Sequence, residues 1–148
     1  MAGEDGPIVI DHAANPPRRM PYGDDMRAII GEDAVGGAFS LHHRTAPPGA
    51  ASFPHSHKKA IEAFYVIDGE FEFEIGGRKF TAGAGMYVQA PKGVSHAWKV
   101  LGGKTAHALV FFSPSVAPAF FDEVDAEVRT GNPDRDKLYA INAKYGLD

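Results

Sequence analysis

The stretch GAASFPHSHKKAIEAFYVIDG, residues 49–69, contains the pattern from which the fold of this chain is predicted. His55 and His57 are two residues apart, so both imidazoles leave the same face of an extended strand. The sequence then passes Glu62 and alternates apolar and other residues up to Asp68-Gly69. This spacing indicates two imidazoles and one carboxylate close together on a β-structure.

Asp68-Gly69 separates two alternating apolar runs, which is typical of a two-residue hairpin turn. Such a turn would bring Glu62 opposite Ile75 on the apolar face of the hairpin. A carboxylate buried on that face is costly unless it is paired or bound to a cation. The two nearby imidazoles indicate a transition metal as that cation. The other expected cross-strand pairs are Val66 with Phe71 and Phe64 with Phe73.

A second stretch, GMYVQAPKGVSH at residues 85–96, supplies a third imidazole. His96 alternates with Trp98 and Val100, which predicts that it also lies on an inward, apolar face. Its tight Pro91-Lys92-Gly93 segment separates two short strand-like runs.

Together the two stretches resemble the paired motifs of the cupin superfamily: Gly…His-x-His…Glu…Gly, then Gly…Pro-x-Gly-x-x-His. The short segment between them, residues 70–84, is similar to the linker of small single-domain cupins of the quercetin-dioxygenase-like kind. Val100 stands where many cupins carry Asn, which is not a ligand in that pattern. The resemblance implies an all-β fold, the double-stranded β-helix or jelly-roll barrel. It also implies that one divalent transition metal (Fe, Mn, Ni, Co, Cu or Zn) is bound by His55, His57, Glu62 and His96.

The composition narrows the class of protein. The chain has 148 residues, a formal net charge of -4 and no cysteine. It therefore offers no basic patch for nucleic acid, no disulfide and no thiolate metal site. No run approaches the roughly 20 apolar residues of a membrane span, and no apolar run of signal length opens the chain. We expect a cytoplasmic protein with neither a nucleic-acid nor a membrane partner.

Three segments are predicted. Residues 1–24, rich in Gly, Pro and charge, form an arm that adds an edge strand or swaps onto a neighbouring subunit. Residues 25–113 form the barrel, because short strands separated by glycine turns are typical of a barrel or sandwich. One such turn, Gly76-Gly77, would pair Phe73 with Phe80. Residues 114–148 form one or two helices that pack on the barrel, the second with Asn132 as N-cap and Pro133 as its first residue.

The inner wall is expected to be apolar or aromatic, with Tyr87 and Trp98 as the best candidates for a substrate pocket. In a strand over residues 37–45, His43 shares a face with Phe39 and Leu41. Its side chain either is paired at the sheet surface or projects into the barrel near the site. His107, in phase with Leu109 and Phe111, would reach the pocket or play a structural role. The full set of candidate pocket residues, for most of which core packing is the alternative, is His43, Phe64, Phe73, Tyr87, Trp98, His107, Phe111 and Phe120.

Three functions compete for such a site. The first is a metal-dependent dioxygenase that acts on a small enol, diketone or phenolic compound, with dioxygen as co-substrate and Glu62 as both ligand and base. The second is a non-redox isomerase, epimerase or cyclase that stabilises an enolate. The third is a non-catalytic metal- or ligand-binding module. A homodimer is also expected, because Tyr65 and Ile67 interrupt a polar outer face and the apolar residues 8–10 need a partner.

Overall fold

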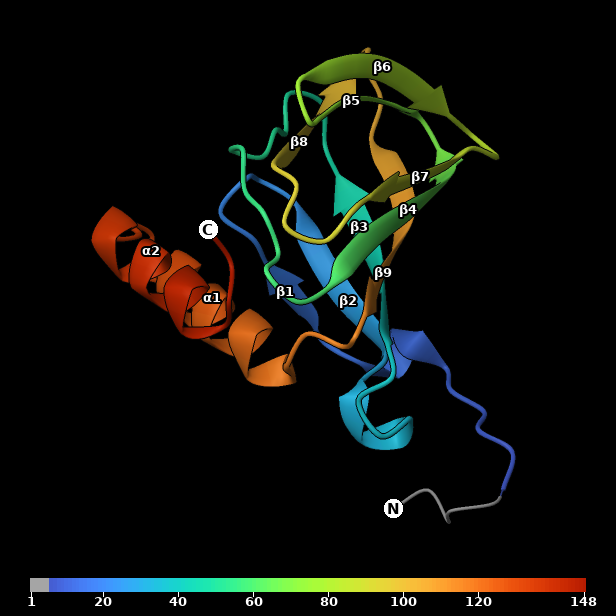
Figure 1. The fold of residues 1–148 in the computed structure, drawn as a ribbon, viewed down its shortest axis with the longest axis vertical. Helices are drawn as coiled ribbons and strands as arrows, with labels where there is room; N and C mark the ends of the chain where they lie inside the picture. The colour runs from blue at the N-terminus through green and yellow to red at the C-terminus, as the bar shows by residue number, and fades with distance from the viewer. Residues whose placement is uncertain (1–5) are drawn as a thin grey trace.

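The computed structural model describes residues 6–148 and contains two antiparallel sheets followed by two helices (Figure 1). The larger sheet has the strand order β1-β2-β3-β9-β4-β7, and the smaller has the order β6-β5-β8. The two sheets face each other and enclose the core, as in a jelly roll. The strands are β1 (Pro17–Arg19), β2 (Asp25–Ile30), β3 (Ser40–Ala46), β4 (Ile61–Asp68), β5 (Glu70–Ile75), β6 (Arg78–Gly83), β7 (Tyr87–Ala90), β8 (His96–Leu101) and β9 (Ala106–Ser113).

The predicted Asp68-Gly69 hairpin is wrong, although the predicted faces are right. β4 pairs with β7 and β9, whereas β5 pairs with β6 and β8, so the chain changes sheets at Gly69. Phe64 and Phe73 do meet, with ring centroids 4.9 Å apart, but across the barrel interior rather than between paired strands. A hairpin and a sheet crossing bury the same alternate residues, so alternation alone cannot distinguish them.

The second predicted turn is confirmed. Gly76-Gly77 joins β5 to β6, and Phe73 lies opposite Phe80 in that register. On its other side Phe73 lies opposite Trp98 of β8. Phe73 and Trp98, both buried, therefore give the smaller sheet an aromatic inner surface, while Phe80 in the edge strand β6 is 39% exposed.

The predicted phase of β3 is inverted. The structure buries Ser40, His42, Arg44 and Ala46, while Leu41 and His43 lie on the outer face. Both faces of this strand carry a mixture of apolar and charged residues, so the sequence pattern has no clear period. Burial of Arg44 is stabilised by Asp24, whose carboxylate accepts a 3.0 Å hydrogen bond from Nε.

The N-terminal segment contributes the edge strand β1, which pairs with β2. Residues 8–10 form no strand, and Val9 is 93% exposed. A short 3-10 turn, η1 (His12–Ala14), precedes β1, and a second, η2 (Glu32–Ala34), follows β2. Residues 1–5 of the predicted arm lie outside the described residues.

Two helices follow the sheets, α1 (Pro118–Val128) and α2 (Arg135–Lys144); α1 packs beside β1, and α2 packs against α1. The N-cap of α2 is Asp134 rather than Asn132, because its carboxylate accepts hydrogen bonds from the amides of Asp136 and Lys137. Among residues 6–148 no helix has both the length and the apolar character required to cross a membrane.

Gly69 provides a test of the sheet crossing. Its φ of +80° favours glycine, and a Cβ there would lie 2.7 Å from the Ala106 Cβ. Gly77 has the same φ with open space around it, so Gly77→Ala isolates the backbone cost of about 1 kcal/mol. We expect Gly69→Ala to lower the free energy of unfolding by about 1–3 kcal/mol more than Gly77→Ala, because of the added overlap. Urea unfolding of both variants measures this; equal losses would contradict the close approach.

Candidate metal centre

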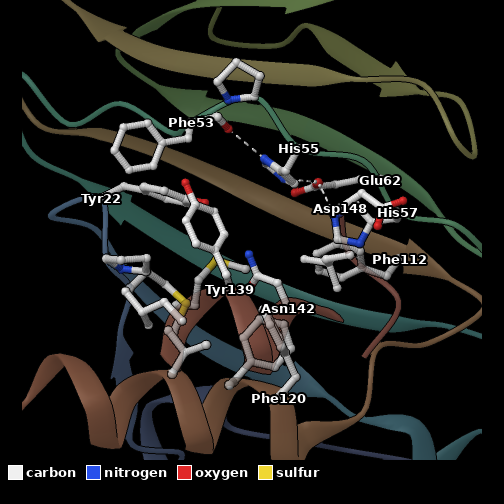
Figure 2. Close-up of a pocket in the computed structure, with 18 of the residues that line it drawn as sticks. Tyr22, Phe53, His55, His57, Glu62, Phe112, Phe120, Tyr139, Asn142 and Asp148 are labelled. Atoms are coloured by element: carbon white, nitrogen blue, oxygen red, sulfur yellow. Dashed lines mark hydrogen bonds and ion pairs between the residues drawn. The ribbon is translucent and has the colours of Figure 1, made fainter. Parts of the chain in front are cut away.

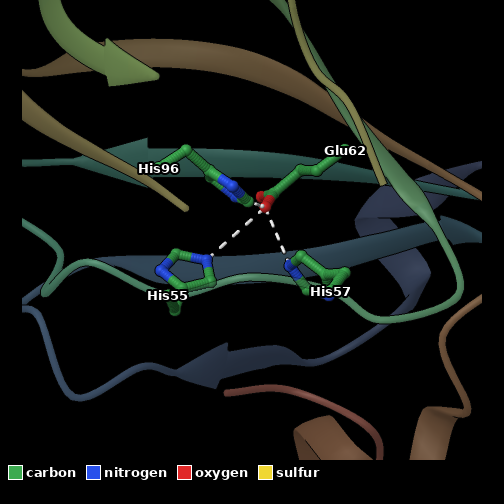
Figure 3. Close-up of side chains that lie close together, drawn as sticks. All are labelled: His55, His57, Glu62 and His96. Atoms are coloured by element: carbon green, nitrogen blue, oxygen red, sulfur yellow. Dashed lines mark hydrogen bonds and ion pairs between the residues drawn. The ribbon is translucent and has the colours of Figure 1, made fainter. Parts of the chain in front are cut away.

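His55, His57, Glu62 and His96 come together in one cluster (Figure 3). The first three of them line a cavity between the barrel and the C-terminal helices (Figure 2). Glu62 comes from β4 in the larger sheet and His96 from β8 in the smaller. His55 and His57 lie in the segment between β3 and β4, which has few strand contacts of its own. The site therefore joins both sheets through one connecting segment.

Backbone hydrogen bonds hold this connecting segment on both sides. His55 exchanges two with His96, at 3.0 and 2.9 Å, which fixes the two ligand-bearing backbones side by side. Ser56 exchanges two with Asp148, at 2.9 and 3.0 Å. The C-terminal residues thus act as a short extra strand beside His57. Both histidines are positioned by segments remote in sequence.

The three imidazoles converge on one carboxylate oxygen (Figure 3). Glu62 Oε2 lies 2.7 Å from His96 Nε2, 2.9 Å from His57 Nε2 and 3.5 Å from His55 Nε2. The candidate ligand atoms all lie within 4.8 Å of one another. Glu62 is only 2% exposed, and His57 and His96 are also buried.

The outer ring nitrogens of two histidines fix their tautomers. His55 Nδ1 lies 2.9 Å from the Phe53 carbonyl, and His96 Nδ1 lies 3.0 Å from the Val94 carbonyl. Because a carbonyl only accepts, both Nδ1 atoms must carry hydrogen. In a neutral ring, Nε2 then directs a lone pair toward Glu62. Two lone pairs and a carboxylate attract one another only through a cation between them.

The pKa shifts of Glu62 and His96 also indicate that the cluster favours a cation. Burial alone would raise the pKa of Glu62, but hydrogen bonds from the three histidines hold it well below its usual value. Burial would lower the pKa of His96, but the hydrogen bond and charge of Glu62 outweigh it and raise that pKa. Glu62 is therefore ionised, and it stabilises positive charge on its neighbours.

The residues fit a divalent transition metal. Three imidazoles, two of them with a fixed tautomer, and one ionised carboxylate form a mixed nitrogen and oxygen donor set, which suits Fe, Mn, Co, Ni, Cu or Zn. Outer hydrogen bonds that orient ligand rings are a regular feature of metal sites. A proton can occupy the same position, so metal and proton compete for it.

The cavity beside the cluster is apolar on most sides (Figure 2). Aromatic and aliphatic side chains of β9, α1 and α2 form one wall, and Tyr22 and Phe53 form another. The polar groups that line it come from Tyr22, Arg44, Arg135, Tyr139, Asn142 and Asp148, in addition to the cluster. The main apolar lining residues are Met20, Phe53, Phe112, Phe120, Phe121, Val124, Leu138 and Leu147.

Of the expected pocket residues, Phe120 lines this cavity. Phe64, Phe73 and Trp98 are buried in the core, which is the alternative interpretation of these positions. Trp98 lies next to the cavity rather than on it, with the Arg44 guanidinium 4.5 Å from its ring. Trp98 thus packs against Arg44, which lines the cavity.

Four candidate pocket residues lie on the outer face of the larger sheet rather than in this cavity. His43 contacts His107 at 3.1 Å and His12 at 3.4 Å, which is the surface pairing considered as its alternative. Phe111 stacks on Phe39 outside the barrel, and Tyr87 is 61% exposed. The error follows from strand phase, because both faces of β3 and β9 carry apolar residues.

The sequence reasoning missed Tyr22, Arg44, Phe112 and Asn142. An inverted phase for β3 and β9 would have identified Arg44 and Phe112. No pattern in the sequence signals Tyr22 or Asn142, because loops and helix surfaces carry polar residues everywhere. Only the packing of the two ends of the chain brings them to the cavity.

Because metal and protons compete for the cluster, the stability of the metal-free protein and its affinity for metal should change with pH in opposite directions. In metal-free protein the raised pKa of His96 contributes stability that is full below its unfolded value of 6.5 and is lost as pH rises through the folded pKa. The contribution of Glu62, whose pKa is lowered, persists above pH 4.5. A bound metal needs deprotonated Nε2 atoms, so its affinity rises with pH.

We therefore expect the melting temperature of metal-free protein to fall between pH 7 and pH 9, while the increase produced by added zinc grows. Differential scanning fluorimetry with zinc or a chelator measures both slopes. His96→Asn removes the titrating imidazole and serves as the control, in which both effects should shrink. Parallel slopes with and without zinc would contradict the competition.

Comparison with known proteins agrees with this geometry. Residues 42–112 match the family model described as "Cupin domain". A polyketide synthase, CurC, from Streptomyces cyaneus is 26% identical over an alignment of 145 positions, and the alignment covers 87% of this chain and 94% of that protein. The family match thus covers the segment that contains all four residues of the cluster.

Solved structures show the same fold. A predicted oxalate decarboxylase from Thermotoga maritima superposes with a TM-score of 0.66 and 21% identity over 72% of this chain and 99% of its own. KdgF from a Halomonas species gives a TM-score of 0.65 and 20% identity over 74% and 94%. An RmlC-like cupin from Shewanella frigidimarina gives 0.60 and 18% over 69% and 86%. At these identities the likeness concerns the fold alone, and together with the family match it establishes that the chain carries a small cupin domain.

Proposed function

We propose that this protein is a metal-dependent enzyme that binds an enolisable or phenolic small molecule beside the four-residue cluster and stabilises its enolate. The observation that carries the proposal is the shared cavity. His55, His57 and Glu62 line the same apolar cavity as Tyr22. A ligand in it would meet a candidate metal site and a phenol while its carbon skeleton contacts aromatic and aliphatic walls.

Tyr22 is suited to donate a hydrogen bond to a ligand oxygen. Burial raises its pKa to about 12, with Asp24 and Glu62 adding to the effect and Arg44 opposing it. Its hydroxyl therefore stays protonated at neutral pH. The ring stacks beside His55, with centroids 6.5 Å apart and an interplanar angle of 21°. The donor is held next to the cluster.

Glu62 is suited to hold a proton as well as a metal. Its Oε2 faces the three imidazoles, whereas Oε1 faces the Arg44 side at 4.0 Å from Nη1. A divalent metal, when bound, supplies Lewis acidity, and a redox-active one also supplies electrons for oxygen chemistry. Oε1 is then the position that can take a proton from a substrate carbon or hydroxyl.

The relative from Streptomyces cyaneus supports this substrate class, because polyketides contain repeated 1,3-dicarbonyl and phenolic units. An enolate-stabilising isomerase or cyclase is the reaction type that we favour. A dioxygenase acting on the same compounds is the second candidate. It is favoured by the mixed donor set, which suits redox-active iron, manganese or copper as well as zinc.

Enolisation can be measured directly. We expect zinc-loaded protein to accelerate exchange of the α-hydrogens of phenylacetone with deuterated water, followed by nuclear magnetic resonance, with or without air. Glu62→Gln should weaken zinc binding and reduce exchange by about 10²–10⁴-fold if Oε1 accepts the proton. Tyr87→Phe, an outer-face substitution, is the matched control. Failure of the zinc-loaded protein to accelerate exchange would refute the proposal.

Oxygen uptake distinguishes the dioxygenase from the isomerase or cyclase. Protein loaded with Fe(II) and supplied with acetylacetone should consume oxygen only if the dioxygenase reaction operates, and zinc should not replace iron in that reaction. Exchange with zinc and no oxygen uptake with iron is the result that we expect. Oxygen uptake with iron alone would instead favour the dioxygenase.

We also propose that the outer face of the larger sheet binds a second copy of this chain. Tyr65 and Ile67 are 47% and 46% exposed on β4, and Tyr65 lies between Tyr87 and Leu109 in the sheet. A contiguous apolar patch on an ordered sheet supports an interface, and a two-fold pairing would cover both copies at once.

Light scattering at micromolar concentration should give about twice the 15.9 kDa mass of one chain. The double substitution Tyr65→Lys, Ile67→Lys should shift the mass to that of a single chain, because it places charge in the interface. Thr81→Lys changes an exposed residue of β6, in the smaller sheet, and should leave the mass unchanged. A single-chain mass for the unmodified protein would contradict the proposal.

A further inference from the structure

Arg44 is a buried cation that makes one hydrogen bond within the part of the chain that the structure describes. Its side chain is 7% exposed, yet it lines the cavity beside the metal cluster. Nε donates to Asp24 Oδ2 at 3.0 Å. Nη1 is buried without a hydrogen-bond partner among the described residues, because Glu62 Oε1 is 4.0 Å away. Buried charged donors are normally satisfied, so this one calls for an explanation.

Pairing with Asp24 does not provide that explanation. An arginine and a carboxylate commonly form two parallel hydrogen bonds. Here they form one, and within residues 6–148 Asp24 Oδ1 is itself buried without a hydrogen-bond partner. The guanidinium is instead held against aromatic rings, 4.5 Å from the centroid of Trp98 and 5.6 Å from that of Phe64. Its position is fixed while much of its donor capacity remains unused.

The charges around Arg44 favour an anion. Arg44 neutralises one of the two buried carboxylates, Asp24 and Glu62. A divalent ion on the cluster would more than neutralise the other, which leaves one positive charge on this side of the cavity. An anionic ligand would remove that excess and supply the missing acceptor together.

We propose that Arg44 binds an oxygen of an anionic substrate whose other oxygen lies at the metal cluster. The chemical class is a small monoanion with two oxygens a few bonds apart, such as the enolate of a 1,3-diketone. This inference rests on the proposed function and specifies its substrate. Arg44 selects the ionised form, because a neutral carbonyl can accept the hydrogen bond but leaves the charge of the guanidinium uncompensated.

Acetylacetone is the probe, and 3,3-dimethylpentane-2,4-dione, which cannot form the enolate between its carbonyls, is the matched neutral ligand. Binding to zinc-loaded protein at pH 8 is measured by calorimetry. It is also measured by the fluorescence of Trp98, the only tryptophan, which lies against Arg44. We expect the unmodified protein to bind acetylacetone and to bind the blocked diketone far more weakly.

Two substitutions separate ligand binding from a structural role of the ion pair. Arg44→Met should weaken acetylacetone binding by about 10–100-fold, the value of a hydrogen bond to a charged group, with zinc content unchanged. Asp24→Asn also breaks the ion pair but leaves the guanidinium, so binding should be equal or tighter. The double substitution Asp24→Asn, Arg44→Met removes both charges, avoids an unpaired Asp24, and should bind as weakly as Arg44→Met.

Several results would overturn the inference. They are an unchanged affinity in Arg44→Met and in the double variant, equal weakening by Arg44→Met and Asp24→Asn, or no binding of acetylacetone to the unmodified protein. The readout is independent of turnover. Binding that depends on Arg44 without α-hydrogen exchange would refute the proposed reaction and leave this inference standing. Conversely, α-hydrogen exchange together with acetylacetone binding that does not depend on Arg44 would refute this inference and leave the proposed reaction standing.

Discussion

The buried carboxylate of Glu62 is the constraint on which the rest of this structure depends. A charge only 2% exposed must be compensated, and three imidazoles from two other segments converge on its Oε2 atom to do so. Carbonyls of Phe53 and Val94 fix two of these rings with a lone pair directed inward. The arrangement is stable only with a cation at its centre. The stability of the fold and the occupancy of the candidate metal site therefore depend on each other.

The segments that hold this site are far apart in sequence. The histidine-bearing segment before β4 is bridged to β8 on one side and to Leu147, which follows α2, on the other. Tyr22, Phe120 and Asn142, which shape the cavity, all lie outside residues 42–112, where the chain matches the cupin family. The shared barrel therefore supplies the cluster, while the two ends of this chain supply most of the surface that a ligand would contact.

The sequence by itself determined the local features. The spacing of the two histidine motifs identified the four residues of the cluster, and the alternation along β4 and β5 identified their buried faces. Glycine pairs marked turns, and one of them, Gly76-Gly77, gave the correct register of Phe73 with Phe80. These features depend on the period of side chains along an extended backbone, which is a property of neighbouring residues.

Tertiary structure decided what this period leaves open. The turn at Gly69 joins two sheets rather than two paired strands, and Arg44 faces inward where His43 was expected. In both cases two arrangements satisfy the same local pattern, and the choice depends on distant partners: Ala106 against Gly69 and Asp24 against Arg44. Charge pairing and close packing between residues far apart in the chain selected the arrangement, and no local pattern records those contacts.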